Sequence, residues 1–153
     1  MPLAAQLPQT VSFPPVASTT FIRYIHNMQV YNDTIMEHFK NPRNVGEIES
    51  ADGVGQAGNV ETGDVMKIYL RVTDDHVIEA RHKTFGNAVA IAVSSMASLM
   101  VINKSLSEAS DISREDVSNA LGGIPEDKMQ CSNMAPDAIK AAINDYRSRS
   151  VKR

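Results

Sequence analysis

The sequence predicts an α+β domain, in which a small antiparallel β-sheet carries helices packed mainly on one face. Two segments that alternate apolar and polar residues flank a short polar turn, which is the pattern of paired antiparallel strands. A long apolar segment follows them, and helix-capping signals recur after it. The length of 153 residues suits one domain with its own core.

Composition excludes several classes of function. The net charge of −3 argues against a nucleic-acid partner, because general nucleic-acid binders usually carry a basic excess. The longest apolar run, residues 88–102, is shorter than the roughly 20 residues of a membrane span, so we predict no membrane association. Cys131 is the only cysteine. A single cysteine excludes an intramolecular disulfide, and it excludes a metal site built solely from the thiolates of one chain.

The predicted domain spans residues 31–148, between an N-terminal extension, residues 1–30, and a basic tail, residues 149–153. The first 27 residues contain no Asp or Glu and four of the seven prolines, and they show no helical or strand periodicity. Two interpretations stay open. A disordered extension would leave the protein cytoplasmic, whereas a transit peptide would send it to a mitochondrial-type matrix.

The first ordered element is a short helix, residues 34–40, which Asn32 or Asp33 can cap and which ends before Pro42. Residues 41–63 are rich in Gly and Asn and are predicted to form a loop. The first strand follows, because Met66, Ile68, Leu70 and Val72 alternate with polar residues.

Residues 73–75 form a turn, and residues 76–85 form the second strand. Its buried face is predicted to hold Ile78, Ala80, His82 and Thr84.

Asn87 can cap the apolar helix, residues 88–102, which should be central because it is apolar nearly all round. Residues 124–132 are predicted to form a loop before the last helix. The remaining helix signals are Ser105 with Glu108, Ser113 with Asp116, a stop at Gly122-Gly123, and a start at Ala135-Pro136-Asp137.

Three junctions at the ends of these elements could carry chemistry, namely residues 62–64, 86–88 and 128–131. Each also has a purely structural interpretation, as a turn, a helix cap and a small buried filler. The four histidines show no metal-ligand spacing, and none neighbours Cys131. From composition and spacing alone, the sequence indicates an α+β domain with one reactive-thiol candidate.

Four stretches resemble the U-type scaffolds of iron–sulfur cluster assembly, the IscU-like proteins and the N-terminal domain of NifU. They are His38 to Gly46 (HFKNPRNVG), Gly63 to Lys67 (GDVMK), Lys83 to Gly86 (KTFG), and Ala138 to Tyr146 (AIKAAINDY). The resemblance implies the family fold, a role in cluster assembly and no enzymatic activity. An iron–sulfur cluster or iron is the implied cargo.

The family builds its cluster on three cysteines, with an aspartate and a histidine close by. The resemblance implies that this chain keeps Asp64 and Cys131 as residual metal ligands, and Lys128 as a supporting cation. It also implies that three ligand positions of the family are replaced here. Thr62 and Asn87 stand at the two other cysteine positions, and Gln130 stands at the histidine position. Clusters prefer thiolates, with imidazole an occasional substitute, so this chain alone holds too few ligands for a two-iron cluster.

The resemblance leaves two functions open for this chain. In the first, the chain still works in assembly, accepting persulfide sulfur from a cysteine desulfurase on Cys131 or binding iron weakly, or sharing a labile cluster in a homodimer. In the second, it is a pseudo-scaffold that binds the desulfurase or other assembly partners without holding a cluster. A thiol enzyme centred on Cys131 is the least favoured alternative. The acidic Glu126 and Asp127 replace part of the loop that the family's chaperone recognises, which argues against chaperone binding.

Overall fold

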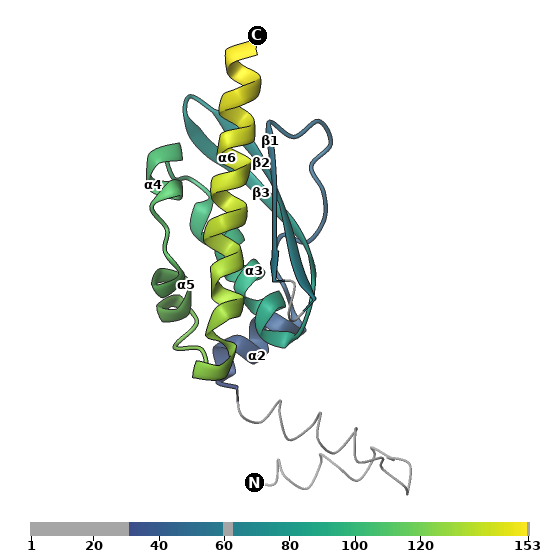
Figure 1. The fold of residues 1–153 in the computed structure, drawn as a ribbon, viewed down its shortest axis with the longest axis vertical. Helices are drawn as coiled ribbons and strands as arrows, with labels where there is room; N and C mark the ends of the chain where they lie inside the picture. The colour runs from purple at the N-terminus through teal and green to yellow at the C-terminus, as the bar shows by residue number, and fades with distance from the viewer. Residues whose placement is uncertain (1–30, 60–62, 153) are drawn as a thin grey trace, which may run out of the picture. The chain divides into compact units, whose positions relative to one another are not determined.

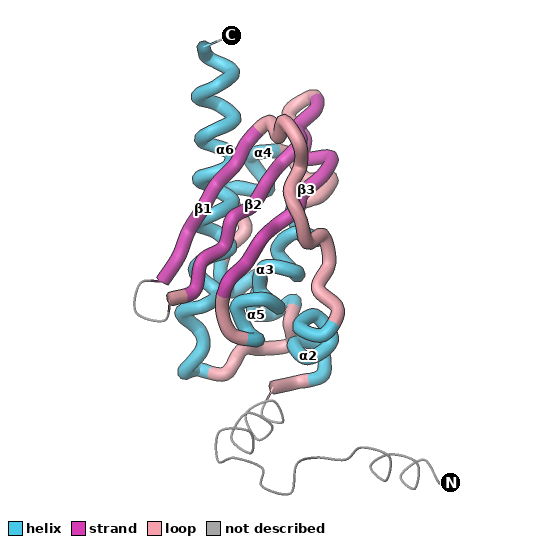
Figure 2. Tube along the Cα trace, turned by 90° about the vertical axis from the view of Figure 1, so that its right-hand side faces the viewer, coloured by secondary structure: helices cyan, strands magenta, loops and turns pink. Residues whose placement is uncertain are grey.

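The computed structural model describes residues 31–59 and 63–152, and it has the predicted α+β architecture. Strands β1 (Gly53–Asn59), β2 (Asp64–Thr73) and β3 (His76–Phe85) form an antiparallel sheet in the order β1-β2-β3. Figure 2 shows this sheet as one layer, with the helices gathered mainly behind it. The predicted N-terminal extension and Thr62 lie outside the described residues.

The predicted loop over residues 41–63 is wrong in part, because strand β1 lies within it. Its glycines have a packing role instead. A Cβ atom on Gly53 or Gly55 would overlap the backbone of helix α6 (Met134–Lys152), at Ala138 and Ala142. Glycine at these two positions therefore lets β1 lie directly against α6. The glycine-rich composition that predicts a loop reflects this close packing of a strand against a helix.

The predicted buried face of β3 is wrong at Ile78. The ladder shifts register between Arg71 and Val72, where Val72 pairs with Val77 and Arg71 pairs with Glu79. Ile78 is the extra residue of this bulge and is 48% exposed, whereas Val77 is fully buried. A bulge reverses the alternation of a strand, and nothing local in the sequence marks its position.

The helices begin where their capping residues predict. Helix α3 (Ala88–Val101) is capped by Asn87 and contributes many buried residues to the main core. Helix α2 (Asp33–Lys40) begins after Asn32. Helices α4 (Leu106–Ser110) and α5 (Arg114–Ala120) have complete capping boxes. Figure 1 shows the long α6 running beside the sheet.

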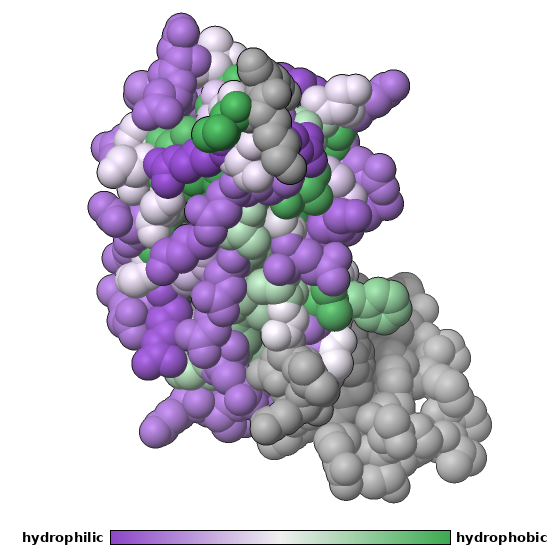
Figure 3. Space-filling view, turned by 45° about the horizontal axis from the view of Figure 1, so that its top comes forward, coloured by the Kyte–Doolittle hydropathy of each residue, from purple (hydrophilic) through white to green (hydrophobic). Residues whose placement is uncertain are grey.

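One predicted loop is helical, since residues 126–133 form the 3-10 helix η3 (Glu126–Asn133). Its bonds join residues three apart, as Lys128 N does with Pro125 O at 2.8 Å, and so they leave no α-helical period to detect. Hydrophilic side chains predominate on the face drawn in Figure 3. Among the described residues, no helix is long and apolar enough to cross a membrane.

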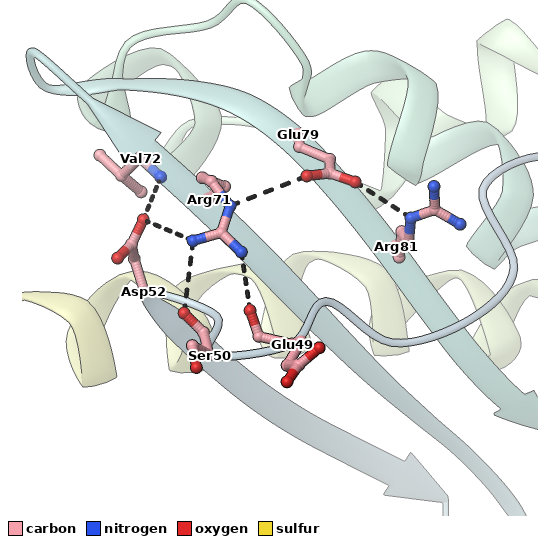
Figure 4. Close-up of polar contacts among 7 residues, drawn as sticks. All are labelled: Glu49, Ser50, Asp52, Arg71, Val72, Glu79 and Arg81. Carbon is pink, nitrogen blue, oxygen red and sulfur yellow. Dashed lines mark hydrogen bonds and ion pairs between the residues drawn. The ribbon is translucent and has the colours of Figure 1, made fainter.

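Residues 41–52, here called the strap, connect α2 to β1 and run beside β3 (Figure 2). Ile48 and Ala51 of the strap bury Tyr69 of β2 in a second, small apolar cluster. Figure 4 shows how Arg71 fastens the strap: its Nη2 donates to Glu49 O at 2.8 Å, and its guanidinium pairs with Asp52. The strap is therefore an ordered part of the domain.

Candidate functional site

The three junctions predicted from the sequence meet at one end of the sheet. Asp64 is the first residue of β2, Asn87 caps α3, and Cys131 lies in η3. The Sγ atom of Cys131 lies 3.5 Å from Asp64 Oδ2 and 3.6 Å from Asn87 Nδ2. These three residues form what we call the site cluster.

Backbone contacts hold the site cluster in place. Asn87 Oδ1 accepts a hydrogen bond from Ala90 N at 2.9 Å, which is the N-cap bond of α3. The backbone N–H of Asn87 donates to Asp64 Oδ1 at 3.3 Å. A Cβ atom on Gly86 would overlap the Asp64 carboxylate, so glycine is needed there to bring β2 and α3 together. The sequence predicts only a helix cap at residues 86–88, so this role of Gly86 has no local signal in the sequence.

Burial keeps the Cys131 thiol protonated. Its side chain is only 1% exposed, and this burial raises the pKa of the thiol above its usual value. The Asn87 amide lowers that pKa, but the Asp64 carboxylate raises it by its charge and by its hydrogen bond. Lys128 also lowers the pKa, as its cationic charge predicts, and it is the smallest of these influences. The thiol is therefore a poor nucleophile in this conformation.

The other candidate residues that the structure describes, Gln130 and Lys128, make no contact with the site cluster that resembles metal ligation. Gln130 is exposed, and Lys128 is half-buried. Thr62 falls outside the described residues. The buried histidines, His38 and His82, bond to serine, threonine and backbone groups elsewhere in the domain.

The donor set does not suit an iron–sulfur cargo. Within the described part of the chain, no three His, Cys, Asp or Glu side chains are grouped so that they could hold a metal ion. The site cluster offers one thiol, one carboxylate and one neutral amide. Cluster iron is held by thiolates and occasionally by imidazole, so two of these three donors are of the wrong kind.

Comparison with known proteins places the chain in a family. Residues 30–153 match the model of the NifU-like N-terminal domain. The chain is 50% identical over 123 residues to the iron–sulfur cluster assembly scaffold protein IscU 1 of Archaeoglobus fulgidus, covering 80% of each chain. It is 45% identical over 123 residues to the scaffold protein IscU of Escherichia coli (strain K12), covering 78% of this chain and 95% of the relative.

Solved structures agree on the fold. A NifU-like N-terminal protein from Brucella abortus superposes with a TM-score of 0.58 at 20% identity, covering 84% of this chain and 99% of the other. A proposed iron–sulfur cluster assembly scaffold protein for the SUF system from Fervidobacterium islandicum AW-1 gives 0.63 at 20% identity, covering 75% and 97%. The chain belongs to the IscU/NifU-N family of iron–sulfur cluster assembly scaffolds, which are not enzymes.

Proposed function

We propose that this protein serves iron–sulfur cluster assembly by binding an assembly partner, foremost a cysteine desulfurase, and that one chain does not hold a cluster. The observation that carries this proposal is the donor set of the site cluster, where a single buried thiol stands beside a carboxylate and an amide. Family membership supports the assembly role, and the intact fold supports retention of partner-binding surfaces.

The chemistry of each donor supports the loss of cluster binding. Asn87 presents a neutral amide where the family has a thiolate, and that amide already caps α3 and contacts the Cys131 sulfur. Asp64 offers hard oxygen atoms, which suit cluster iron less well than sulfur does. The raised pKa of Cys131 opposes formation of the one thiolate that remains.

Two measurements on the same preparation test this proposal, with the Archaeoglobus fulgidus scaffold IscU 1 as the matched control. Titration calorimetry with a cysteine desulfurase should give a micromolar or tighter dissociation constant. Anaerobic reconstitution with iron and sulfide should leave the chain colourless, while the control develops visible absorbance. Absence of binding at micromolar concentration would contradict the proposed binding of a desulfurase. A stable coloured product on this chain would contradict the proposal that one chain does not hold a cluster.

A second candidate is sulfur acceptance by Cys131, which the Asn87 amide favours. The amide Nδ2 lies 3.6 Å from the Cys131 sulfur and lowers the pKa of the thiol, so it would stabilise the thiolate that forms when the thiol loses its proton to water. The Cys131 sulfur would then attack the outer sulfur of a desulfurase persulfide. A new S–S bond forms on Cys131, the desulfurase S–S bond breaks, and the desulfurase cysteine leaves as a thiolate that takes up the proton.

Mass spectrometry after incubation with desulfurase and cysteine tests this second candidate. The chain should gain the mass of one sulfur atom, reductant should remove it, and the Cys131→Ser variant should gain none. An unmodified wild-type chain would exclude sulfur acceptance while leaving the calorimetric test unaffected. Light scattering on the same samples tests the predicted homodimer.

A further inference from the structure

The outer face of the sheet, which points away from the main core, carries a row of polar side chains. Gln56 of β1 pairs with Lys67 of β2, and Lys67 pairs with Lys83 of β3. Side chains directly opposite each other on antiparallel strands have their Cβ atoms about 4.5–5.5 Å apart, and like charges at this spacing repel each other. The two lysines therefore concentrate positive charge on this face, at a cost in stability that a bound anion would offset.

A row of apolar side chains lies beside the polar row. Val65 of β2 pairs with Phe85 of β3, and each lies two residues along its strand from a lysine of the polar row. Phe85 is 81% exposed and Val65 is 37% exposed. Gly58, the residue opposite Val65 on β1, has no side chain to cover them. The ring of Phe85 therefore adds little to the packing of the domain and is open to a ligand.

The two rows line one groove of about 490 Å³ on the outer face. This volume lies within the range of about 300–1,000 Å³ that is usual for small-molecule sites. One wall of the groove has two ammonium groups and an amide, and the other has an aromatic ring and an aliphatic side chain, from Lys67, Lys83, Gln56, Phe85 and Val65. Such a lining fits an organic anion whose charged group is joined to a flat, apolar body.

Glu47 of the strap neutralises part of the charge of the lysine pair. It forms an ion pair with Lys83. The hydrogen bond and the charge of Lys83 lower the pKa of Glu47 most, and the charge of Lys67 lowers that pKa as well. The carboxylate thus acts on both ammonium groups. One negative charge beside two positive charges still leaves one positive charge over.

The neighbouring cations of the outer face are balanced by an acid, unlike Lys67. Figure 4 shows that Arg71 and Arg81 both contact the carboxylate of Glu79. The ammonium group of Lys67 instead lies 5.5 Å from the centre of the Tyr69 ring, and no ion pair within residues 31–59 and 63–152 includes it. The positive charge that remains therefore lies at Lys67, in the wall of the groove.

A phosphate ester matches this pattern of charge better than a carboxylate does. A phosphate group carries up to about two negative charges near neutral pH and several acceptor oxygens, so one group can contact both lysines. A carboxylate brings a single charge, which Glu47 already supplies. The exposed ring of Phe85 suits an aromatic base, because bases of every kind stack on aromatic side chains. The Gln56 amide in the same groove has both a donor and an acceptor for the base or the sugar.

We propose that this groove is a binding site for a nucleoside phosphate, in which Lys67 and Lys83 contact the phosphate, Phe85 stacks on the base, and Glu47 competes with the phosphate for the lysines. The groove offers one exposed aromatic ring, which suits a single nucleotide rather than a strand of nucleic acid. This inference goes beyond the proposed function and is independent of it, because neither Cys131 nor a desulfurase takes part.

Titration of the full chain with adenosine diphosphate at low salt, followed by amide NMR shifts, tests the site. The shifts should be largest at the residues of the two rows and should give a dissociation constant below about 1 mM. Pyrophosphate and adenosine each carry one half of the ligand, and each should bind at least about tenfold more weakly. No saturable shift, or binding of pyrophosphate or adenosine as tight as that of the whole nucleotide, would overturn the proposal.

Two substitutions on the walls of the groove should weaken this binding. Lys67→Gln removes the positive charge that is left over, and Phe85→Ser removes the stacking ring, so each should raise the dissociation constant at least about fivefold. Lys140→Gln is the matched control, because it removes the same charge from an exposed position on α6, outside the groove. Equal weakening by Lys67→Gln and Lys140→Gln would overturn the proposal, since it would show attraction by net charge alone.

A substitution in the strap should strengthen the same binding. Glu47→Gln removes the carboxylate that competes for the lysines, so the dissociation constant should fall at least about threefold. Glu49→Gln makes the same change of charge at an exposed strap position outside the groove, and it should have a smaller effect. Unchanged or weaker binding by Glu47→Gln, or an equal gain in both variants, would also overturn the proposal.

Discussion

Helix α3 carries two polar clusters that differ in how tightly they are bound. At its first turn, Asn87 is joined to Asp64 by a bond of 3.3 Å and to Cys131 by a contact of 3.6 Å. In its middle, Ser94 and Ser95 make contacts of 2.7 to 2.9 Å with β3, α2 and the strap. Sulfur is a large atom and accounts for part of the difference, but the bond from Asn87 N to Asp64 is also long.

This difference indicates that the middle of α3 serves the stability of the fold, whereas its first turn belongs to the candidate site. The serines of α3 satisfy buried groups that could not reach water, so the fold depends on them. The site cluster is joined by longer contacts, so a substitution there should disturb the fold less than a substitution of the α3 serines.

The largest effect should come from breaking the middle cluster. Ser95→Ala removes the hydroxyl that accepts the Arg43 N–H and contacts His38 Nδ1. Both of these nitrogen atoms would then lose their hydrogen-bond partner inside the protein. We expect a loss of about 3 kcal/mol in the free energy of unfolding, measured by urea denaturation. Ser107→Ala, on the exposed side of α4, is the control and should change little. An equal loss in both variants would contradict the comparison.

Acid should weaken the same cluster. The folded-state pKa values of His38 and His82 lie below 6.5, so the unfolded chain binds more protons in acid. Their contribution to stability is therefore complete above pH 6.5 and is lost as pH falls through the lowered pKa values. Urea denaturation at pH 7.5 and pH 5.5 should show this loss, and His38→Gln/His82→Gln should show less of it.

A substitution in the site cluster should cost less stability. Cys131→Ala removes a buried sulfur but leaves the N-cap bond of Asn87 intact, so we expect a loss of about 1 kcal/mol. The comparison fails if urea denaturation shows Cys131→Ala to be as damaging as Ser95→Ala.

The smallest effect should be a change in reactivity. Asp64→Asn removes the negative charge that raises the Cys131 pKa and keeps an oxygen for Asn87 N. The thiol should react with a disulfide reagent several-fold faster at pH 7.5, as long as the fold is unchanged. A slower reaction would show that the carboxylate assists the thiol rather than suppressing its ionisation.

The sequence predicts the fold where local rules act alone. The alternation of Met66 to Val72 and the caps at Asn32 and Asn87 all depend on residues within a few positions, and the structure confirms them. The errors occur where distant residues decide. Gly55 belongs to a strand because α6 lies against it, and Ile78 faces outward because the ladder shifts register at Arg71.

The candidate site shows the same limit. Spacing alone places Asp64, Asn87 and Cys131 at the ends of three elements, and only the fold shows that these ends meet. The proximity of Lys128 favours a thiolate, but burial decides the outcome, and burial is a property of the packed domain. The convergence of His38 and His82 on Arg43 likewise has no signal in their scattered positions.

The cap of α3 suggests how the domain could be returned to metal chemistry. Asparagine is among the best N-cap residues, and the family's cysteine at this position caps less well. The proposed loss of a ligand at Asn87 would therefore coincide with a gain in helix stability, which is the usual trade between a stable fold and a working site. Asn87→Cys would exchange about 1 kcal/mol of stability for a second thiol beside Cys131, and the domain thus offers a starting point for redesigning a metal centre one ligand at a time.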